Sequence, residues 1–432
     1  MRTNSARSFP GQHRAFRSFA CVLAGLLLLP ATAGAAEEPE RQECWERNAA
    51  PPPAVDTSEV PPPGVPSPPP LPVPEEPVGG DRLGECGLIL PDGAPPPPEG
   101  ITAASWLIAD LETGAVLAAQ DPHARHRPAS TIKVLTALVA IREMELDDTI
   151  VATQEDADQE GSRVGLVPGT TYTVEQVVTG LLMQSGNDAA HALARKAGGM
   201  DAMVDKMNEL ARQLGALDTR AATPSGLDGP GMSASAYDLA LIFREALREP
   251  AFAKAISTKQ TLLPGAPEQP PLEIWSDNSL LLNYPGAIGG KTGFTDDARH
   301  TFIGAAERDG RKLVTVLMRG EVENERLPAQ AMRLLDYGFE LPEDAEVGEL
   351  VTGKPKPESP SPTPAPRAAE QEVQEASGTD SGDTERSLFG NAGGPLALLA
   401  GAATALVGMV AVRNRRMRAM SRSDDGGSAD DD

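Results

Sequence analysis

A serine and a lysine lie three residues apart where a long apolar segment begins. Ser130 and Lys133 open the segment STIKVLTALVAIREMEL, which stays apolar on nearly every side until Arg142. This pattern predicts a buried helix that carries both side chains on one face. Burial lowers the pKa of a lysine because it destabilises the charged form, and a neutral amine can take the proton of a serine hydroxyl. The alternative is a lysine that extends to solvent along its alkyl stem.

A second group of polar residues follows the apolar helix predicted over VEQVVTGLLMQ, where the chain reads Ser185, Gly186, Asn187. A loop between two buried helices can direct such side chains into a cleft. There Ser185 could relay a proton and the Asn187 amide could hold a peptide carbonyl. The same residues also form an ordinary turn and helix cap. The SDN segment at 276–278 is a competing match, but no helix is expected before it, so Ser185 is preferred.

A third group is the segment GGKTGF, in which Lys291 and Thr292 lie between glycines. The segment is expected to run along the edge of a sheet. Glycines there let a ligand backbone approach closely, and an ammonium with a hydroxyl can bind a carboxylate. Taken alone, a glycine-rich loop explains the segment equally well.

The order and spacing of the three groups resemble a known enzyme superfamily. Class A β-lactamases and penicillin-binding proteins share Ser-x-x-Lys, Ser-x-Asn and Lys-Thr-Gly in this order. Here successive motifs begin 55 and 106 residues apart, which places all three in one domain. Over residues 101–320 the chain is most similar to the low-molecular-mass D-alanyl-D-alanine carboxypeptidases. The segments that carry this resemblance are ADLETGAVLAAQDP, PASTIKVLTAL, LLMQSGNDAA, TPSGLDGPGMSASAYDLA and GGKTGFT.

The resemblance implies a role for each matching residue. Ser130 would be the acylated nucleophile, Lys133 its general base, and Ser185 the group that carries a proton to the leaving amine. The backbone N–H groups of Ser130 and Phe294 would form the oxyanion hole. The substrate-binding residues that it implies are Asn187, Lys291, Thr292, Gly293 and Phe294. The substrates would be peptidoglycan peptides that end in D-Ala-D-Ala, and β-lactams would act as inhibitors.

The elements that position these residues indicate an α+β fold. ASWLIADLETGAVLAAQ predicts two strands, TFIGAAERDGRKLVTVLMRG predicts a hairpin, and helical patterns fill the sequence between them. We therefore expect the β-lactamase/transpeptidase-like fold, in which an antiparallel sheet built from both ends of the domain packs against a helical cluster.

Composition divides the 432 residues into six segments. Many of the 41 prolines lie in two low-complexity stretches, which favour extended polyproline structure. The first stretch is expected to be a spacer, with a ligand site for a partner as the alternative. The predicted segments are a signal peptide (1–35), a proline-rich spacer (36–100), the catalytic domain (101–345), a disordered Pro/Ser/acidic linker (346–387), a transmembrane helix (388–412) and a cytoplasmic tail (413–432).

The two ends of the chain predict its location. A basic start, an apolar core and the small residues at 33–35 are typical of a secretory signal. The uncharged run 388–412, followed by RNRRMR, predicts one membrane span with a cytoplasmic tail; a buried amphipathic helix is the alternative. Export favours a disulfide between Cys44 and Cys86 over two free thiols.

Several classes of function are disfavoured. The net charge of −24 argues against nucleic-acid binding, and no cysteine–histidine cluster suggests a metal or cofactor. A β-lactamase is disfavoured because LDTRAATPSGL has no glutamate where class A enzymes carry Glu-x-x-x-Asn. A transpeptidase would use the same acyl-enzyme and stays open. An inactive sensor of wall fragments is the alternative from another class, and the intact motifs argue against it.

Overall fold

The computed structural model describes residues 44–53, 59–266 and 268–353. The predicted signal peptide, membrane helix and cytoplasmic tail lie outside these residues, as do 36–43 of the predicted spacer and 354–387 of the predicted linker. Within the described part of the chain, no helix combines the length and apolar character needed to cross a bilayer.

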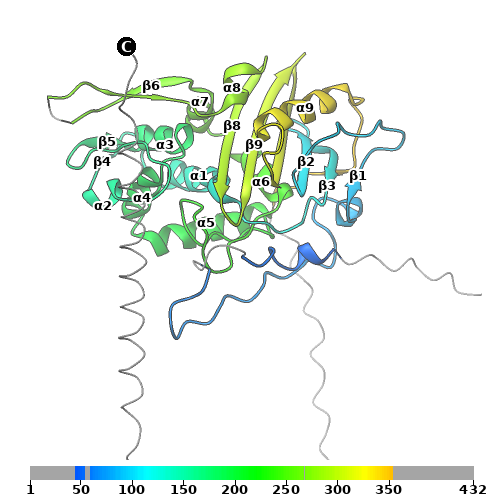
Figure 1. The fold of residues 1–432 in the computed structure, drawn as a ribbon, viewed down its shortest axis with the longest axis horizontal. Helices are drawn as coiled ribbons and strands as arrows, with labels where there is room; N and C mark the ends of the chain where they lie inside the picture. The colour runs from blue at the N-terminus through cyan, green and yellow to red at the C-terminus, as the bar shows by residue number, and fades with distance from the viewer. Residues whose placement is uncertain (1–43, 54–58, 267, 354–432) are drawn as a thin grey trace, which may run out of the picture. The chain divides into compact units, whose positions relative to one another are not determined.

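A seven-stranded antiparallel sheet forms the centre of the domain, in the order β1-β3-β2-β10-β9-β8 with β11 also paired to β3 (Figure 1). Strands β2 and β3 come from the start of the domain, and β8, β9 and β10 come from its end. The prediction of a sheet built from both ends is therefore confirmed. Its strands are β1 (Leu88–Ile89), β2 (Ser105–Asp110), β3 (Ala115–Gln120), β8 (Ala287–Thr295), β9 (Arg299–Arg308), β10 (Arg311–Gly320) and β11 (Gly348–Glu349).

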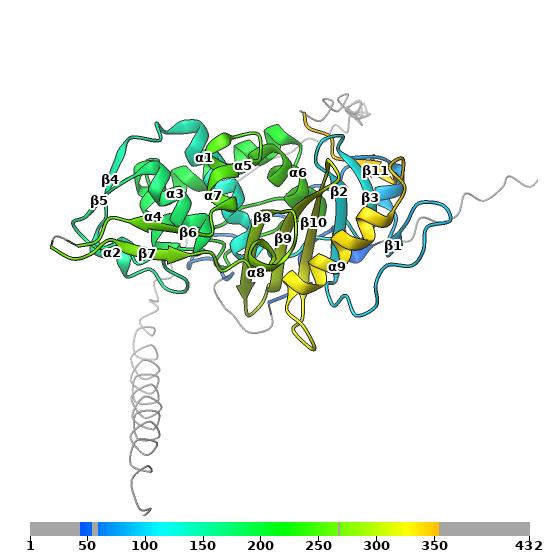
Figure 2. The ribbon, with the colours of Figure 1, turned by 90° about the horizontal axis from the view of Figure 1, so that it is seen from above.

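Helices cover both faces of this sheet (Figure 2). Helix α9 packs on β2, β9 and β10 from one side, and α6 packs on β2 and β10 from the other. Behind α6, helix α1 contacts α3, α4, α5, α6 and α7, whereas α8 packs on β8 and α9. The helices are α1 (Lys133–Glu143), α2 (Gln154–Ala157), α3 (Val174–Met183), α4 (Asn187–Lys196), α5 (Met200–Leu214), α6 (Ala236–Ala246), α7 (Pro250–Ser257), α8 (Ser279–Asn283) and α9 (Leu327–Glu340).

Two short antiparallel ribbons complete this part of the fold. The first pairs β4 (Thr149–Val151) with β5 (Thr171–Thr173), and the second pairs β6 (Gln260–Leu263) with β7 (Leu272–Trp275). In Figures 1 and 2 the β6–β7 ribbon extends from the side of the helical cluster.

The local sequence explains where the important helices begin. A capping box between Thr173 and Gln176 starts α3, and the Ser235 hydroxyl accepts the Asp238 N–H at the start of α6. The segment predicted as one helix from Ser130 begins instead as a 3₁₀ turn, η3 (Ala129–Ile132), and continues as α1. Residues 133–140 of α1 are all buried, as its apolar pattern predicts.

The segment predicted as a proline-rich spacer differs from that expectation. Some of its described residues contact the domain, others are exposed, and Cys44 and Cys86 are joined in a disulfide. The short strand β1 joins the central sheet, and Leu83 and Ile89 are each 1% exposed in its core. Proline-rich sequence cannot form a core of its own, but here it packs on a core that the domain supplies. The folded unit therefore begins well before residue 101.

Candidate active site

Ser130 and Lys133 lie together at the junction of η3 and α1. The Lys133 Nζ is 2.8 Å from the Ser130 Oγ. Lys133 is fully buried, whereas Ser130 is partly exposed and lines a cleft of about 670 Å³. The serine can therefore meet a ligand while the amine stays out of solvent.

Two further contacts of the Lys133 amine are compatible with its neutral form. Its Nζ lies 2.7 Å from the Asn187 Oδ1 and within hydrogen-bonding distance of the Ser225 carbonyl oxygen. Both oxygens are acceptors only, so they take the two N–H groups of a neutral amine. The nitrogen lone pair is then left to accept the Ser130 O–H. This arrangement is the one that a general base requires.

Electrostatics favour the same protonation state. Burial lowers the pKa of Lys133 well below its usual value, and the charge of nearby Lys291 lowers it further, against the opposing effects of Asp188 and Asp277. The alternative in which Lys133 extends to solvent is therefore wrong for this structure.

A glycine that sequence reasoning did not select packs against the nucleophile. Gly226 has φ +83°, and a Cβ added to it would lie 2.0 Å from the Ala129 oxygen and 2.9 Å from the Ser130 nitrogen. Ala129 itself has φ 48° and is fully buried. Ser225, next to Gly226, supplies the carbonyl that binds Lys133. The loop from 223 to 228 therefore forms one side of the Ser130 site.

The second motif faces the same cleft. Ser185 and Asn187 both line it, and Ser185 has φ 58°, a left-handed conformation between α3 and α4. Besides its contact with Lys133, the Asn187 side chain donates from Nδ2 to the Glu160 oxygen at 2.7 Å. Asn187 therefore orients the amine, and its second N–H is left over for a ligand.

The third motif lies on β8, at the edge of the sheet, as predicted. Lys291 is 1% exposed, and burial lowers its pKa to about 8, against an opposing effect of Asp277. Gly293 faces the nucleophile, because a Cβ there would lie 3.0 Å from the Ser130 nitrogen. Thr292 and Phe294 line the cleft, and the Phe294 ring stacks on His300 with a centroid separation of 4.6 Å.

The competing motif at 276–278 divides between structural and site positions. The Ser276 hydroxyl accepts the Asn278 N–H, and the Asn278 side chain caps α8. Asp277, however, lines the cleft and accepts a 3.0 Å hydrogen bond from the Thr292 hydroxyl. The preference for Ser185 agrees with this geometry, but sequence reasoning missed Asp277.

Comparisons with known proteins agree with this site. The family profile described as D-alanyl-D-alanine carboxypeptidase matches residues 93–321. The D-alanyl-D-alanine carboxypeptidase DacB2 of Mycobacterium tuberculosis is 48% identical over 267 residues, which cover 61% of this chain and 90% of that protein. The chain belongs to the D-alanyl-D-alanine carboxypeptidase family.

Other relatives in this carboxypeptidase family match over a smaller share of their length. DacF of Bacillus subtilis is 31% identical, and the match covers 55% of this chain and 62% of DacF. Among solved structures, a D-alanyl-D-alanine carboxypeptidase from Mycobacterium tuberculosis superposes with TM-score 0.58 at 47% identity, covering 60% of this chain and 99% of that one. The Streptomyces K15 DD-transpeptidase superposes with TM-score 0.53 at 26% identity, covering 57% and 100%.

Histidines and acids elsewhere in this carboxypeptidase form structural networks. His191 contacts Asp156 at 2.6 Å, away from the cleft. His123, Asp218 and Asp238 approach one another closely enough to suggest a metal site. Arg125 already donates to Asp218, and Asp238 accepts from Thr219. Since its oxygens are engaged by protein donors, this cluster fits a buried hydrogen-bond network better than a metal centre.

Proposed function

We propose that this chain is a serine D-alanyl-D-alanine carboxypeptidase that removes the terminal D-alanine of peptidoglycan stem peptides. The observation that carries the proposal is the 2.8 Å contact between the Ser130 hydroxyl and a fully buried lysine amine whose other two positions are taken by acceptors. Its family membership and the cleft beside Ser130 support the same activity.

The geometry suggests a route for each proton and bond. As Ser130 Oγ attacks the carbonyl carbon of the penultimate D-alanine, its proton passes to the Lys133 nitrogen. The C–N bond then breaks, and the leaving D-alanine amine takes that proton from Lys133 through Ser185. Water next attacks the acyl carbon and gives a proton to the neutral Lys133 amine. Lys133 returns this proton to the Ser130 Oγ as the ester bond breaks, so that the shortened peptide leaves as a carboxylate. The Lys291 ammonium and the Thr292 hydroxyl hold the terminal carboxylate.

A fluorescent penicillin tests this assignment, because β-lactams acylate the same serine. We expect the adduct to map by mass spectrometry to Ser130 and to disappear in Lys133→Ala. Release of D-alanine from a peptide ending in D-Ala-D-Ala should be lost in the same variant. An adduct on another residue, or labelling that persists in Lys133→Ala, would contradict the mechanism.

The loop from 223 to 228 disfavours a β-lactamase activity. The loop from 223 to 228 presents the Ser225 carbonyl and Gly226 to the Ser130 turn, whereas a class A enzyme uses a glutamate to activate the deacylating water. We therefore expect the penicilloyl adduct to persist for many catalytic turnovers of the peptide substrate.

We further propose that the protein acts outside the cytoplasm, anchored by one C-terminal helix. The support is the sequence alone: the signal-like residues 1–35 and the uncharged run 388–412 before a basic cluster. Protease treatment of intact spheroplasts should digest the catalytic domain and leave a short C-terminal fragment in the membrane. Protection of the catalytic domain would rule this topology out.

A further inference from the structure

The N-terminal strap, which we define as residues 44–53 and 59–87, presents backbone carbonyls to the domain. Proline has no N–H and polyproline chains make no internal hydrogen bonds, so these carbonyls remain available. Arg125 and Arg127, only 1% and 2% exposed, supply the donors. The strap oxygens they contact are those of Asn48, Leu71 and Pro72 for Arg125, and Pro51 for Arg127. A buried guanidinium without such partners would be strongly destabilising.

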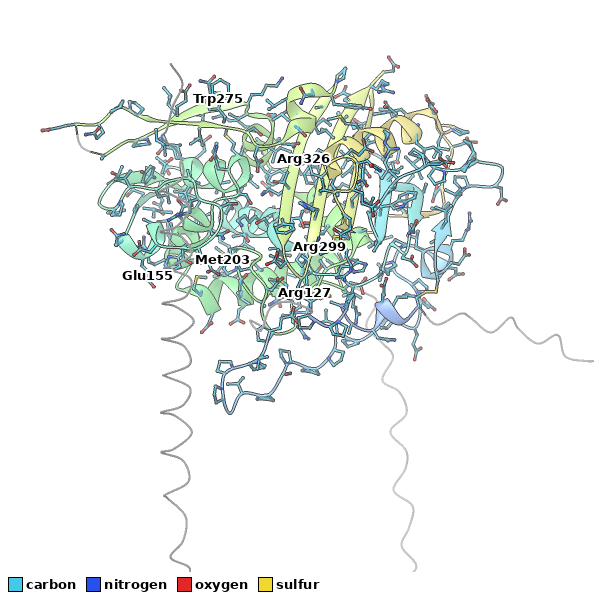
Figure 3. All side chains as sticks on the ribbon, in the orientation of Figure 1. Arg127, Glu155, Met203, Trp275, Arg299 and Arg326 are labelled. Atoms are coloured by element: carbon cyan, nitrogen blue, oxygen red, sulfur yellow. A yellow bond between two sulfur atoms is a disulfide. The ribbon has the colours of Figure 1, made fainter. Side chains whose placement is uncertain are left out.

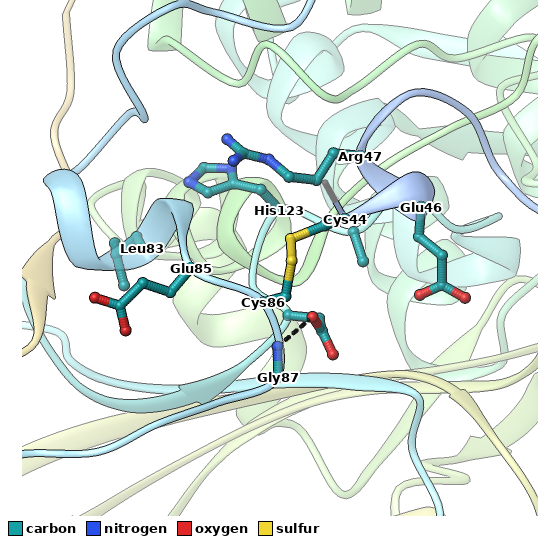
Figure 4. A pocket seen from close by; sticks show the side chains of 10 residues that line it. Cys44, Glu46, Arg47, Leu83, Glu85, Cys86, Gly87 and His123 are labelled. Atoms are coloured by element: carbon teal, nitrogen blue, oxygen red, sulfur yellow. Dashed lines mark hydrogen bonds between the residues drawn. A yellow bond between two sulfur atoms is a disulfide. The ribbon is translucent and has the colours of Figure 1, made fainter. Parts of the chain in front are cut away.

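The disulfide holds the two ends of the strap together. Cys44 and Cys86 are 42 residues apart in sequence, and their Cα atoms are 5.7 Å apart. Figure 4 shows the bridge next to the hydrogen bond from the Gly87 N–H to the Asp121 carboxylate, which is 2.7 Å long. Strand β1 then begins at Leu88. The strap is therefore fastened at both ends and along its length.

Arg127 connects the strap to the turn that carries the nucleophile. It precedes Ser130 by three residues, and it lies where the N-terminal segment meets the domain (Figure 3). Between them, the Pro128 carbonyl accepts the Thr301 hydroxyl at 2.8 Å, and Ala129 adopts φ 48°. An alanine enters this left-handed region only when its surroundings hold it there. A shift at Arg127 would consequently move Ser130.

Charges on both sides hold Arg127 in place. Its side chain pairs with Glu59 of the strap. Burial would lower the pKa of Arg127, but Glu59 first, then Asp228 and Asp297, raise it. Asp228 is 7% exposed and follows Gly226 by two residues, on the loop whose Ser225 carbonyl binds Lys133. Arg127 thus lies between the strap, the nucleophile turn and the loop that orients the base.

We propose that Arg127, held by Glu59 and the Pro51 carbonyl, is a positioning residue for Ser130, so that the strap sets the acylation rate as well as the stability. The inference rests on the proposed function, because it concerns the reactivity of the same serine. It gives the proline-rich segment a role in catalysis without any contact between that segment and the substrate.

The test compares Glu59→Gln with a matched control in the full-length chain. Glu59→Gln keeps the side-chain shape but removes the charge that holds Arg127. Glu249→Gln removes one of the two carboxylates that pair with Arg142, in an ion pair away from the cleft. We expect Glu59→Gln to lower the second-order rate of acylation by fluorescent penicillin at least about tenfold, because misplacing reacting groups by about 1 Å can lower rates about 100-fold. Glu249→Gln should stay within twofold of the wild type.

Two further measurements separate positioning from mere stability. Amide hydrogen exchange in residues 129–133 should accelerate in Glu59→Gln and not in Glu249→Gln. Arg127→Lys, which keeps the charge but lacks the planar fork of N–H donors of a guanidinium, should show a smaller loss of acylation than Arg127→Gln. If Glu59→Gln melts earlier yet acylates within twofold of the wild type and leaves exchange at 129–133 unchanged, the strap is only structural and the proposal fails. A wild type that penicillin does not label overturns the proposed function instead, and the exchange data still decide the positioning.

Discussion

Replacing Gly226 with alanine should slow the acylation of Ser130 strongly while the protein still folds. An added Cβ would lie 2.0 Å from the Ala129 oxygen, and real Cβ atoms essentially never approach other heavy atoms closer than 3.0 Å. Either the loop or the nucleophile turn must therefore move by about 1 Å. Because the Ser225 carbonyl binds the Lys133 amine, the shift separates the serine from its base whichever side moves.

Gly169 supplies a matched control for the cost of placing an alanine in the left-handed backbone conformation. It has the same φ, +83°, but a Cβ added there would have no other atom within 4 Å. Gly169→Ala should cost only the left-handed conformation, about 1–2 kcal/mol of unfolding free energy. Gly226→Ala adds the steric conflict, for a total of about 2–5 kcal/mol. Thermal melting and denaturant titration measure both losses.

The decisive assay is the acylation rate of folded protein by fluorescent penicillin. We expect Gly169→Ala to react at the wild-type rate and Gly226→Ala to react about 100-fold more slowly, as displacement of reacting groups by about 1 Å predicts. Equal rates in the two variants, at a concentration and temperature where circular dichroism shows both folded, would refute the claim that this glycine fixes the nucleophile.

Three further predictions concern contacts in the same domain. Ser185→Ala should slow D-alanine release at least about tenfold if Ser185 relays the leaving-group proton, whereas Ser276→Ala, which loses only a hydrogen bond from a backbone N–H, should stay within twofold in the same assay. Carboxylate binding needs a charged Lys291, so KM should rise as pH increases through about 8, the pKa of Lys291. In Lys291→Arg the rise in KM should occur at higher pH, which a pH–rate profile measures. Removing the Cys44–Cys86 bridge, which closes a loop of 42 residues, should lower the unfolding free energy by about 4 kcal/mol in the chain-entropy account, and an unchanged denaturation midpoint would contradict the loop argument.

Short sequence patterns were sufficient to predict the framework of the site. The apolar run after Ser130 predicts a buried helix, and that burial is the physical reason why the pKa of Lys133 falls. Alternating patterns predict the strands at both ends of the domain, and their pairing places Lys291 on the edge strand β8. These inferences succeed because each depends on residues close together in the chain.

The missed features depend on pairs of segments far apart in the chain. Nothing in the segment TPSGLDG shows that Gly226 will lie against Ala129, which is almost 100 positions earlier in the chain. Proline-rich sequence likewise does not reveal its partners, because the buried Arg125 and Arg127 that bind its carbonyls come from another part of the sequence. Asp277 was seen only as part of a competing motif, because its partner Thr292 is a tertiary neighbour.

The two buried lysines of the site need opposite protonation states, and the structure provides a physical basis for both. Lys133 lies between two acceptor oxygens and next to another amine, so burial and that like charge both favour its neutral form. Lys291 is equally buried, and Asp277 opposes the effect of burial on both amines, but only Lys133 is also affected by a neighbouring like charge, and the pKa of Lys291 falls only to about 8. The lowered pKa of Lys133 therefore favours the amine form that accepts the Ser130 proton, while Lys291, with a pKa of about 8, still carries near neutral pH the charge that a substrate carboxylate needs. Because a charged Lys291 disfavours a charged Lys133, the residue that binds the carboxylate also keeps the base ready for reaction.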